Sequence, residues 1–325
     1  MITDIHRHFV PPVFFDFAKT LPDYALKVKR EQGEEIDVDI RGMHFGLTRT
    51  FFDLDRQVAR MKKEGVERAI LSLATPFINY HLDAVVAIKA AHQFNDAIAA
   101  AVAGQRDRFG VWAFLPMQDP AAAAEELRRC VRNLGCVGAH IASNVRGVYL
   151  DSEQFNPIYE AALELNVPLF VHPADPPGKE RTRDYELTVV AGYLFDSTIN
   201  LLRMICSGFL DRWSGLKFVF AHTGAFSMAL RARMQREVDT NRQLVAALKA
   251  PVGDYLRRLY FDTVCFEPKI LEYAATVVPV EHLMMGSDAP FPLGEADPVN
   301  FVRRALPAEQ ASAILSQNFD RMIGA

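Results

Sequence analysis

The sequence predicts an α/β fold, a (β/α)8 TIM barrel built as a single domain over residues 1–325. Short apolar runs of strand length alternate eight times with longer segments of helical periodicity. The 325 residues are 50% hydrophobic and 23% charged, which is enough apolar material to fill a barrel core. No glycine-rich GxGxxG segment follows any of the runs, which argues against a doubly wound dinucleotide-binding sheet.

The eight expected strands are 2–8, 67–73, 109–115, 136–142, 167–172, 216–222, 259–264 and 282–287. Helices are expected over 54–64, 83–103, 121–133, 156–166, 299–306 and 308–322. Local signals support several of these boundaries. Asp119-Pro120 places proline at the first position of a helix, and Asn166 closes another helix directly before an apolar run.

Two connections are longer than ordinary loops. Residues 10–52 contain alternating runs on either side of Gln32-Gly33, which predicts a small β-hairpin inserted after strand 1. Residues 173–198 begin Pro-Ala-Asp-Pro-Pro-Gly and are expected to form a lid loop after strand 5. Long βα connections of a barrel lie on its C-terminal face, where such enzymes keep their chemistry. We therefore expect both segments to cover the active site.

Composition narrows the class of partner. A formal net charge of −4 provides no basic surface for nucleic acid or for an anionic membrane, so a small molecule is expected. The four cysteines show no CxxC spacing and are expected to be reduced thiols. The first strand follows the initial methionine without a signal peptide, and the longest apolar stretch, 97–103, is too short to span a bilayer. These features predict a cytoplasmic protein.

Histidines at strand ends predict a metal site. His6 and His8 are two residues apart on a strand, so their side chains are expected to point to the same face. His172 closes the fifth expected strand and Asp288 follows the eighth. Neutral imidazoles and a carboxylate are the ligands that a borderline divalent ion takes. The sequence therefore predicts that His6, His8, His172 and Asp288 bind one divalent metal ion.

Each of these residues also has a plainer explanation when taken alone. His6 and His8 are compatible with a buried hydrogen-bonded pair, His172 with a loop cap before Pro173, and Asp288 with an Asx turn before proline. Four such coincidences at matching strand ends are less economical than one metal site. Asp4 is expected either to accept a hydrogen bond from a ligand histidine or to cap the entry to the strand.

Further histidines are candidates for the chemistry. His222 ends the sixth strand and is either a fifth ligand or, as we favour, an acid/base that exchanges a proton between metal-bound water and substrate. His140 ends the fourth strand and is a candidate contact of the metal or the substrate, and His44 in the insertion is a candidate contact of the substrate.

The motifs DxHxH, FVHP, FAHxG and GSDxPFP, in this order, resemble the amidohydrolase superfamily and specifically its amidohydrolase-2 branch. The strings at 74–80, 115–119, 261–263 and 286–295 are similar to the 2-amino-3-carboxymuconate-6-semialdehyde decarboxylases of that branch. The resemblance runs from residue 2 to about residue 322. It implies that His6, His8, His172 and Asp288 hold one ion, zinc before manganese, and that His222 is the catalytic acid/base.

The resemblance also implies residues that bind the substrate carboxylate. Arg233 matches an arginine that reaches the site of a neighbouring subunit, which implies a homodimer or a higher homo-oligomer. Arg41 and Arg49 compete for the role of a second arginine from the insertion. Guanidinium groups suit this role because they bind carboxylates in a bidentate manner.

The function expected from these observations is non-oxidative decarboxylation of a small unsaturated or aromatic carboxylic acid. The metal would coordinate the substrate or supply hydroxide, and His222 and Asp288 would move the proton. A hydrolase or hydratase acting on a lactone, amide or unsaturated acid uses the same ligands and stays open as the alternative. A catalytically silent barrel is disfavoured because all four ligands are present.

Overall fold

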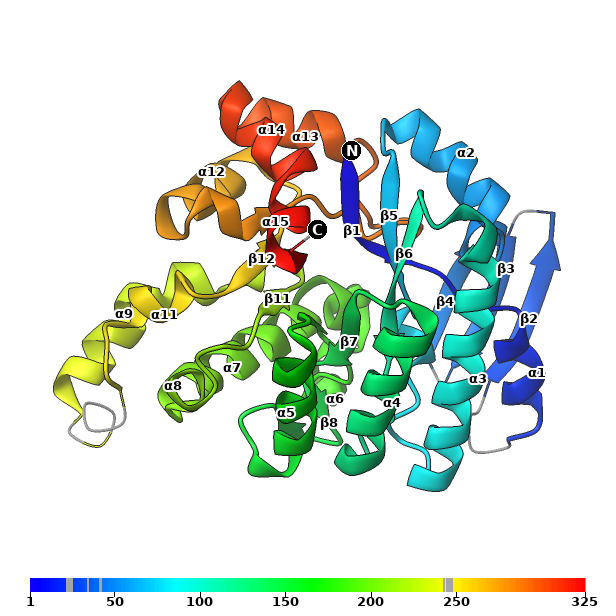
Figure 1. Ribbon diagram of the computed structural model, residues 1–325, viewed down its shortest axis with the longest axis horizontal. Helices are drawn as coiled ribbons and strands as arrows, with labels where there is room; N and C mark the ends of the chain where they lie inside the picture. The colour runs from blue at the N-terminus through cyan, green and yellow to red at the C-terminus, as the bar shows by residue number, and fades with distance from the viewer. Residues whose placement is uncertain (22–25, 34, 41–42, 242, 244–247, 325) are drawn as a thin grey trace.

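The computed structural model describes residues 1–21, 26–33, 35–40, 43–241, 243 and 248–324 and confirms the predicted barrel (Figure 1). Eight parallel strands form one sheet, and helices cover its outer face. In sheet order the strands are β1 (Thr3–His8), β5 (Arg68–Ser72), β6 (Phe109–Phe114), β7 (Gly138–Ala142), β10 (Leu169–His172), β11 (Phe218–Phe220), β12 (Tyr260–Asp262) and β13 (Leu283–Met284). Every predicted strand is present, shortened by one to four residues.

The first and last strands meet and close the barrel. The Ile5 N–H donates to the carbonyl of Met285 at 2.9 Å, and Arg7 forms a parallel bridge with Ala289. The N–H of Asp288 donates to the carbonyl of His6 at 2.8 Å. Closure therefore brings the predicted ligands of the first and last strands side by side.

The helices follow the predicted pattern of alternation. They are α1 (Val13–Lys19), α2 (Leu54–Glu64), α3 (Ala84–Val102), α4 (Pro120–Leu134), α5 (Asn156–Leu165), α6 (Lys179–Thr182), α7 (Tyr193–Cys206), α8 (Phe209–Arg212), α9 (Ser227–Thr240), α11 (Val252–Leu256), α12 (Pro268–Val277), α13 (Pro298–Ala305), α14 (Ala308–Ser316) and α15 (Asn318–Ile323). The helix predicted over 308–322 is two helices, because the backbone breaks at Gln317.

Local capping explains where several helices begin and end. The Asp119 carboxylate accepts hydrogen bonds from the first amides of α4, whose first residue is proline. Gly135 ends α4 in the left-handed conformation, and Asn166 ends α5 in the same way. These caps are readable in the sequence, which is why the predicted boundaries of these helices lie within one residue of those observed.

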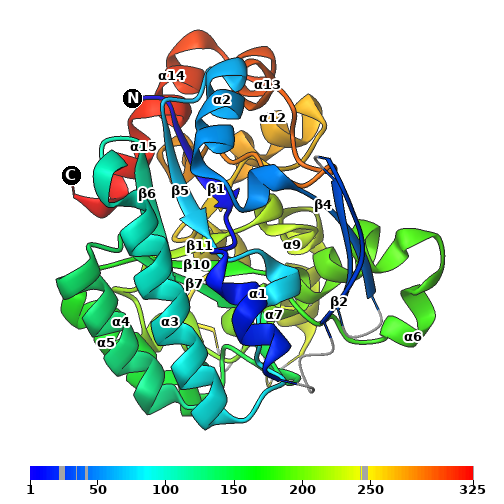
Figure 2. The ribbon, with the colours of Figure 1, turned by 90° about the vertical axis from the view of Figure 1, so that its right-hand side faces the viewer.

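The insertion after β1 is larger than the predicted hairpin. It forms a three-stranded antiparallel sheet of β2 (Leu26–Gln32), β3 (Glu35–Ile40) and β4 (Met43–Thr48). The third strand, MHFGLT, contains glycine and histidine and shows only weak alternation, so its sequence gave little strand signal. Figure 2 shows this sheet and α6 on the same side of the barrel. A short hairpin of β8 (Asn144–Val145) and β9 (Val148–Tyr149) follows β7.

The segment after β10 is largely helical where a loop was expected. After α6 it continues through a π-helical turn, η7 (Thr188–Gly192), directly into α7. Within the described residues, 184–206 is the one helical stretch whose length and composition match a membrane span, and 44% of its apolar window is buried. The polar side chains of Asp196 and Asn200 in α7 are fully buried. This stretch therefore packs as part of the barrel wall.

The barrel interior is filled below the site. Ile5, Trp112, Phe170 and Met284 pack together there, and Phe319 of α15 extends this cluster at the closed end. The Trp112 indole N–H donates to the carbonyl of Ile5 at 2.8 Å. A solid core at this end leaves the C-terminal ends of the strands as the place for chemistry.

Candidate metal centre and active site

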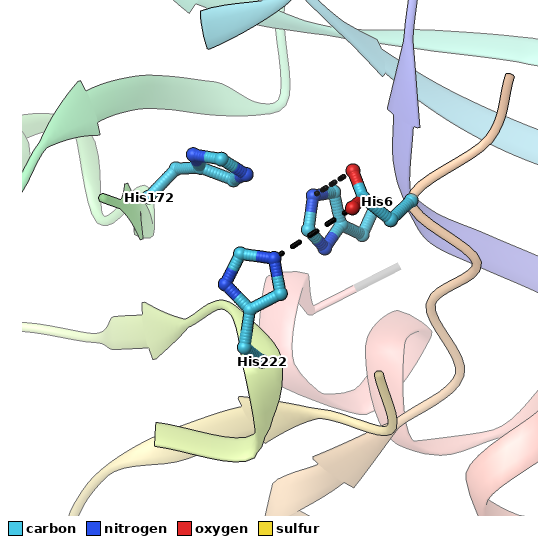
Figure 3. Close-up of side chains that lie close together, drawn as sticks. His6, His172 and His222 are labelled. Atoms are coloured by element: carbon cyan, nitrogen blue, oxygen red, sulfur yellow. Dashed lines mark ion pairs between the residues drawn. The ribbon is translucent and has the colours of Figure 1, made fainter. Parts of the chain in front are cut away.

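Three imidazoles and one carboxylate converge at the C-terminal ends of the strands. The Nε2 atoms of His6 and His8 lie 3.2 Å apart. The Asp288 Oδ1 lies 2.9 Å from the Nε2 of His8 and 3.3 Å from that of His6. His172 faces the same point from β10, with its ring centroid 5.0 Å from that of His6 (Figure 3).

The outer nitrogen of each of these three imidazoles has a partner. The Nδ1 of His6 lies 2.6 Å from Asp262 Oδ2, and the Nδ1 of His8 lies 3.1 Å from the Ser72 hydroxyl. The Nδ1 of His172 lies 2.7 Å from the Thr75 hydroxyl and 2.9 Å from the carbonyl of Pro173. Such partners fix ring orientation and tautomer, so the three Nε2 atoms are left to face inward.

A divalent metal ion fits this arrangement. The Nε2 of His172 is buried and has no hydrogen-bond partner among the described residues, a costly state for a polar atom that nothing else satisfies. Three inward imidazole nitrogens with one carboxylate are a donor set that zinc and manganese accept. The residues that would hold the ion are therefore His6, His8, His172 and Asp288.

His222 lies at the same centre. Its Nε2 is 3.7 Å from Asp288 Oδ2, and its ring is 5.0 Å from that of His172. Donor atoms of His6, His172, His222 and Asp288 all lie within 4.8 Å of one another. This set includes His222 in place of His8, although the Nε2 of His8 is closer to Asp288. We assign His8 to the ligands because its outer nitrogen is anchored and its Nε2 points at Asp288, whereas the Nδ1 of His222 has no partner among the described residues.

The charges of the centre suit cation binding. Burial by itself raises the pKa of Asp288, but the positive charge of His6 and hydrogen bonds from His222, His6 and His8 hold that pKa well below 3.8. Burial lowers the pKa of His172 well below 6.5 and also lowers that of His8. At neutral pH, Asp288 is therefore a carboxylate and both of these imidazoles are neutral, the forms that coordinate metal.

His6 is the exception and gives a pH-dependent prediction. Burial by itself lowers its pKa, but the charges of Asp288 and Asp262 outweigh burial and raise the pKa to about 10. Metal binding must displace this proton, so we expect uptake at pH 7.5 to release about one proton and metal affinity to rise roughly tenfold per pH unit. Calorimetric titration in buffers of different ionisation enthalpy measures this release. Uptake without proton release would contradict the prediction.

The raised pKa of His6 also affects the stability of the metal-free protein. Because the folded pKa of His6 lies above its unfolded value of 6.5, the contribution of charged His6 to stability is complete below about pH 6.5. It is lost as the pH rises toward about 10. Denaturant unfolding of the metal-free protein across this range is therefore expected to show falling stability.

A cavity of about 420 Å³ opens above the centre. His172, His222 and Asp288 lie in its lining, with Thr75 beside them. The other lining residues come from the insertion, the segment after β10 and the loops after β12 and β13: His44, Phe45, Gly46, Glu186, Val189, Val190, Tyr193, Leu194, Phe266, Phe291, Pro292 and Leu293. Most of these are apolar. Among the described residues that line the cavity, none is lysine or arginine.

Other predicted substrate contacts lie elsewhere. His140 is buried beneath the centre, with its ring 5.5 Å from that of His172, and it does not line the cavity. Arg49 lies outside the cavity and binds the carbonyl of Gly33 and the Glu31 carboxylate. These positions arise because His140 is in the middle of β7, two residues before its end, and because Arg49 follows β4 at the base of the insertion. Arg41 lies outside the described residues.

Arg233 is exposed on α9 and lines a separate groove with Leu202, Leu230 and Met234. It makes no hydrogen bond or ion pair with the described residues of its own chain. Within one chain it therefore does not contact the cavity.

The partners of the ligand histidines were not predicted from the sequence. Asp4 was expected either to support a ligand ring or to cap the entry to the strand. A β-bulge between Asp4 and Arg7 breaks the alternation of β1, and Asp4 does not contact a ligand ring. The Asp4 carboxylate instead accepts hydrogen bonds from the Arg7 guanidinium and the Ser287 hydroxyl. Asp262 supports His6 in its place. The sequence did not mark Asp262 as a strand-end carboxylate, because the strand expected over 259–264 runs past it, whereas β12 ends at Asp262.

Close packing around Gly286 gives a third prediction. A Cβ at this position would lie 2.9 Å from the Cβ of His6 and 3.0 Å from that of Asp262. Gly286→Ala is therefore expected to push β13 away from β1, to cost about 1–3 kcal/mol of stability, and to weaken metal binding. Denaturant unfolding and metal titration measure both effects. The control is Gly253→Ala, where no atom lies within 4 Å, and equal effects of the two variants would contradict the prediction.

Comparison with known proteins places the chain in a family. The amidohydrolase family model matches residues 3–324. The chain belongs to the amidohydrolase family. A relative by sequence is the 2-amino-3-carboxymuconate-6-semialdehyde decarboxylase of Dictyostelium discoideum, 28% identical over 91% of this chain and 83% of the relative.

Two solved structures have the same fold as this chain. The 5-carboxyvanillate decarboxylase of Sphingomonas paucimobilis superposes with a TM-score of 0.85 at 26% identity, covering 99% of this chain and 98% of the other. A dihydroxybenzoic acid decarboxylase of Polaromonas sp. JS666, solved with bound manganese and the inhibitor 2-nitroresorcinol, shares the fold with a TM-score of 0.79 at 24% identity over 99% and 96% of the two chains. The relatives named here are decarboxylases.

Proposed function

We propose that this amidohydrolase removes CO₂ from a small aromatic carboxylic acid at a single divalent metal ion. The observation that carries the proposal is the set of inward-facing nitrogens of His6, His8 and His172 beside Asp288, at the floor of a largely apolar cavity. Relatives named for decarboxylation of aromatic or unsaturated acids support the reaction type.

His6, His8, His172 and Asp288 would hold the ion. A bound divalent ion supplies Lewis acidity, which draws electron density from a coordinated oxygen and positions it for reaction. Zinc was expected from the resemblance, whereas the Polaromonas structure contains manganese. The activity test therefore uses both ions, and manganese is tried first.

His222 and Asp288 would move the proton that replaces CO₂ on carbon. The two groups lie 3.7 Å apart and both face the cavity. Asp288 is held as a carboxylate by its neighbours. A proton carried by His222 can therefore be exchanged beside the reacting carbon, and Asp288 holds the ring in place by charge.

The cavity walls support an aromatic substrate. Phe45, Tyr193, Phe266 and Phe291 surround the space with aromatic surface, which suits a flat ring. Because the described lining contains no lysine or arginine, a second carboxylate would find no cationic partner among the described residues of one chain. We therefore propose an aromatic acid with one carboxylate, bound with that group toward the metal ligands.

Arg233 gives a proposal about assembly. Its exposed guanidinium has no partner among the described residues of its own chain, which is compatible with a role in the site of a neighbouring copy, as the resemblance implies. The working unit would then be a homodimer or a higher homo-oligomer. Size measurement by light scattering, combined with Arg233→Ala kinetics, tests this: a fully active monomer would remove the role.

The direct test is carbon-13 labelled CO₂ release. Protein loaded with manganese or zinc is incubated with hydroxybenzoates carrying one or two labelled carboxylates. We expect labelled gas from single-carboxylate aromatic acids and less from dicarboxylates. A product that gains water without gas release, from a lactone, amide or unsaturated acid, would overturn the proposal in favour of a hydrolase or hydratase.

A further inference from the structure

Asp262 occupies a position between the metal ligands and the acid/base. It ends β12, which lies in the sheet between β11, the strand before His222, and β13, the strand before Asp288. Its side chain is fully buried. The proposed chemistry of the ligands, of His222 and of Asp288 does not use it.

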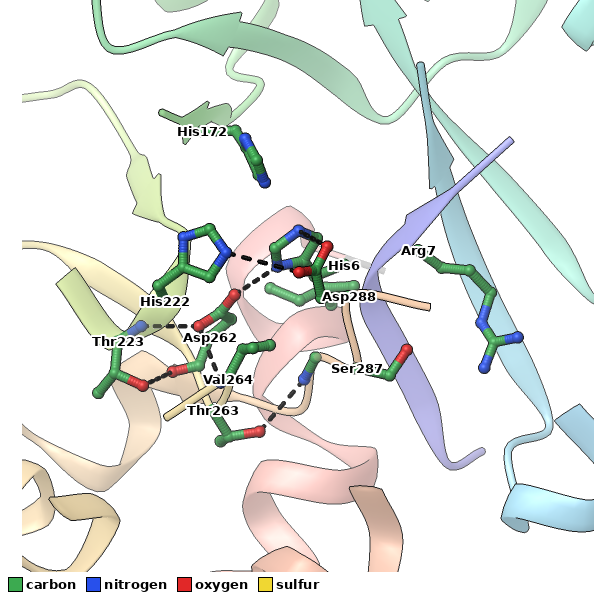
Figure 4. Close-up of polar contacts among 12 residues, drawn as sticks. His6, Arg7, His172, His222, Thr223, Asp262, Thr263, Val264, Ser287 and Asp288 are labelled. Atoms are coloured by element: carbon green, nitrogen blue, oxygen red, sulfur yellow. Dashed lines mark hydrogen bonds and ion pairs between the residues drawn. The ribbon is translucent and has the colours of Figure 1, made fainter. Parts of the chain in front are cut away.

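The two oxygens of Asp262 serve two different segments. Oδ2 lies 2.6 Å from the Nδ1 of His6. Oδ1 accepts hydrogen bonds from the main-chain N–H of Thr223 at 2.8 Å and of Val264 at 3.0 Å. The Thr223 hydroxyl also donates to the carbonyl of Asp262 at 3.2 Å (Figure 4). One carboxylate thus joins a ligand histidine to the residue that follows His222.

The loop that carries His222 needs such an anchor. His222, Thr223 and Ala225 all have a φ of 55°, and Gly224 between them has a φ of 69°. Three non-glycine residues in this left-handed region within four positions form a conformation that an isolated chain rarely populates. The surrounding structure must hold it, and the contact of Asp262 Oδ1 with the Thr223 N–H is a buried one.

Packing against Phe261 also restricts the position of the loop that carries His222. A Cβ at Gly224 would lie 2.6 Å from a ring carbon of Phe261, the residue directly before Asp262. The loop therefore rests against the end of β12 with no space for a larger residue. The strand end supports the loop through Phe261 and fixes it through Asp262.

We propose that Asp262 is a positioning residue that sets the distance between the metal ligand His6 and the acid/base His222. Through Oδ2 it keeps the Nδ1 of His6 protonated, so that Nε2 faces the ion. Through Oδ1 it holds the left-handed turn that aims the His222 ring into the cavity. This inference rests on the proposed function, and its two parts can be tested separately.

Two substitutions separate the parts. In Asp262→Asn the amide oxygen can still accept from the Thr223 and Val264 N–H groups, but its NH₂ group cannot accept from His6. In Asp262→Ala both contacts are lost. We expect both variants to bind Mn²⁺ about 10–100-fold more weakly than the wild type, the range found when the outer partners of ligands are changed.

The variants should differ in turnover. At saturating Mn²⁺ the asparagine variant is expected to keep kcat within about threefold of the wild type, and the alanine variant to lose at least a further tenfold in kcat with little change in KM. The histidine ring signals of ¹⁵N-labelled, metal-free protein give a reading that does not depend on turnover. The signal of His222 should shift or broaden in the alanine variant only.

Glu126→Gln is the matched control. Glu126 is another buried carboxylate, hydrogen-bonded to Asn95 and Arg129 in the outer helical layer. Its loss is expected to lower stability without changing Mn²⁺ affinity or kcat. Wild-type Mn²⁺ affinity in either Asp262 variant would contradict the proposed role of the contact with His6. Equal kcat and equal His222 signals in the two variants would contradict the proposed anchoring of the loop. If the wild type released no CO₂, the proposed function would fail while the metal affinities and ring signals still tested Asp262.

Discussion

The His172→Asn protein is expected to lose its metal ion and its activity together. The Nε2 of His172 is buried without a partner among the described residues, whereas its Nδ1 is held by Thr75 and Pro173. The replacement removes one of three nitrogen donors, so metal affinity should fall by more than the roughly 10–100-fold that outer partners contribute. Elemental analysis after dialysis and carbon dioxide release from the same sample measure both losses.

His140→Asn is the matched control for this variant. His140 is also a buried histidine of a neighbouring strand, its ring lies 5.5 Å from that of His172, and it has no hydrogen-bond partner among the described residues. Its replacement by the same residue should leave the metal content unchanged. Metal retained in the His172 variant, or lost equally in both, would contradict the assignment of the ligands.

The His222→Ala protein is expected to retain its metal and lose at least about two orders of magnitude in kcat, the usual share of acid/base catalysis. The ring reaches Asp288 at 3.7 Å and lines the cavity, whereas its Nδ1 has no partner among the described residues, so removal should disturb little else. Steady-state kinetics with saturating metal, together with metal analysis of the same sample, give the measurement.

His44→Ala is the control for the His222 variant. His44 also lines the cavity, but it is exposed on β4 and interacts with Asp39. Its loss is expected to change KM more than kcat. Near-normal turnover of the His222 variant would remove His222 from the mechanism, and loss of metal from that variant would make His222 a ligand.

The barrel could be predicted because each of its strands is a short apolar run followed by a helical segment. The boundaries of α4 and α5 were also readable, because Asp119-Pro120 and Asn166 are capping signals that act locally. The third strand of the insertion was missed because its sequence, MHFGLT, does not alternate clearly. The segment after β10 was taken for a loop because its first residues are rich in proline, although the apolar residues that follow form η7 and α7.

In the candidate site, the metal ligands could be predicted from the sequence, but their hydrogen-bond partners could not. His6 and His8 could be selected because they are two residues apart on one strand, and His172 and Asp288 because each lies at or after the end of a strand. The role of Asp4 could not be predicted, because it depends on a β-bulge that exists only in the paired sheet. Asp262 lies 256 positions from His6 in the chain, so their contact at 2.6 Å is set by barrel closure and leaves no local signal.

Diffraction at the manganese absorption edge, from crystals grown with MnCl₂, tests the central claim most directly. We predict one anomalous peak within bonding distance of the Nε2 atoms of His6, His8 and His172 and of the Asp288 carboxylate. An empty centre at saturating manganese, or a peak bound by other residues, would contradict the account.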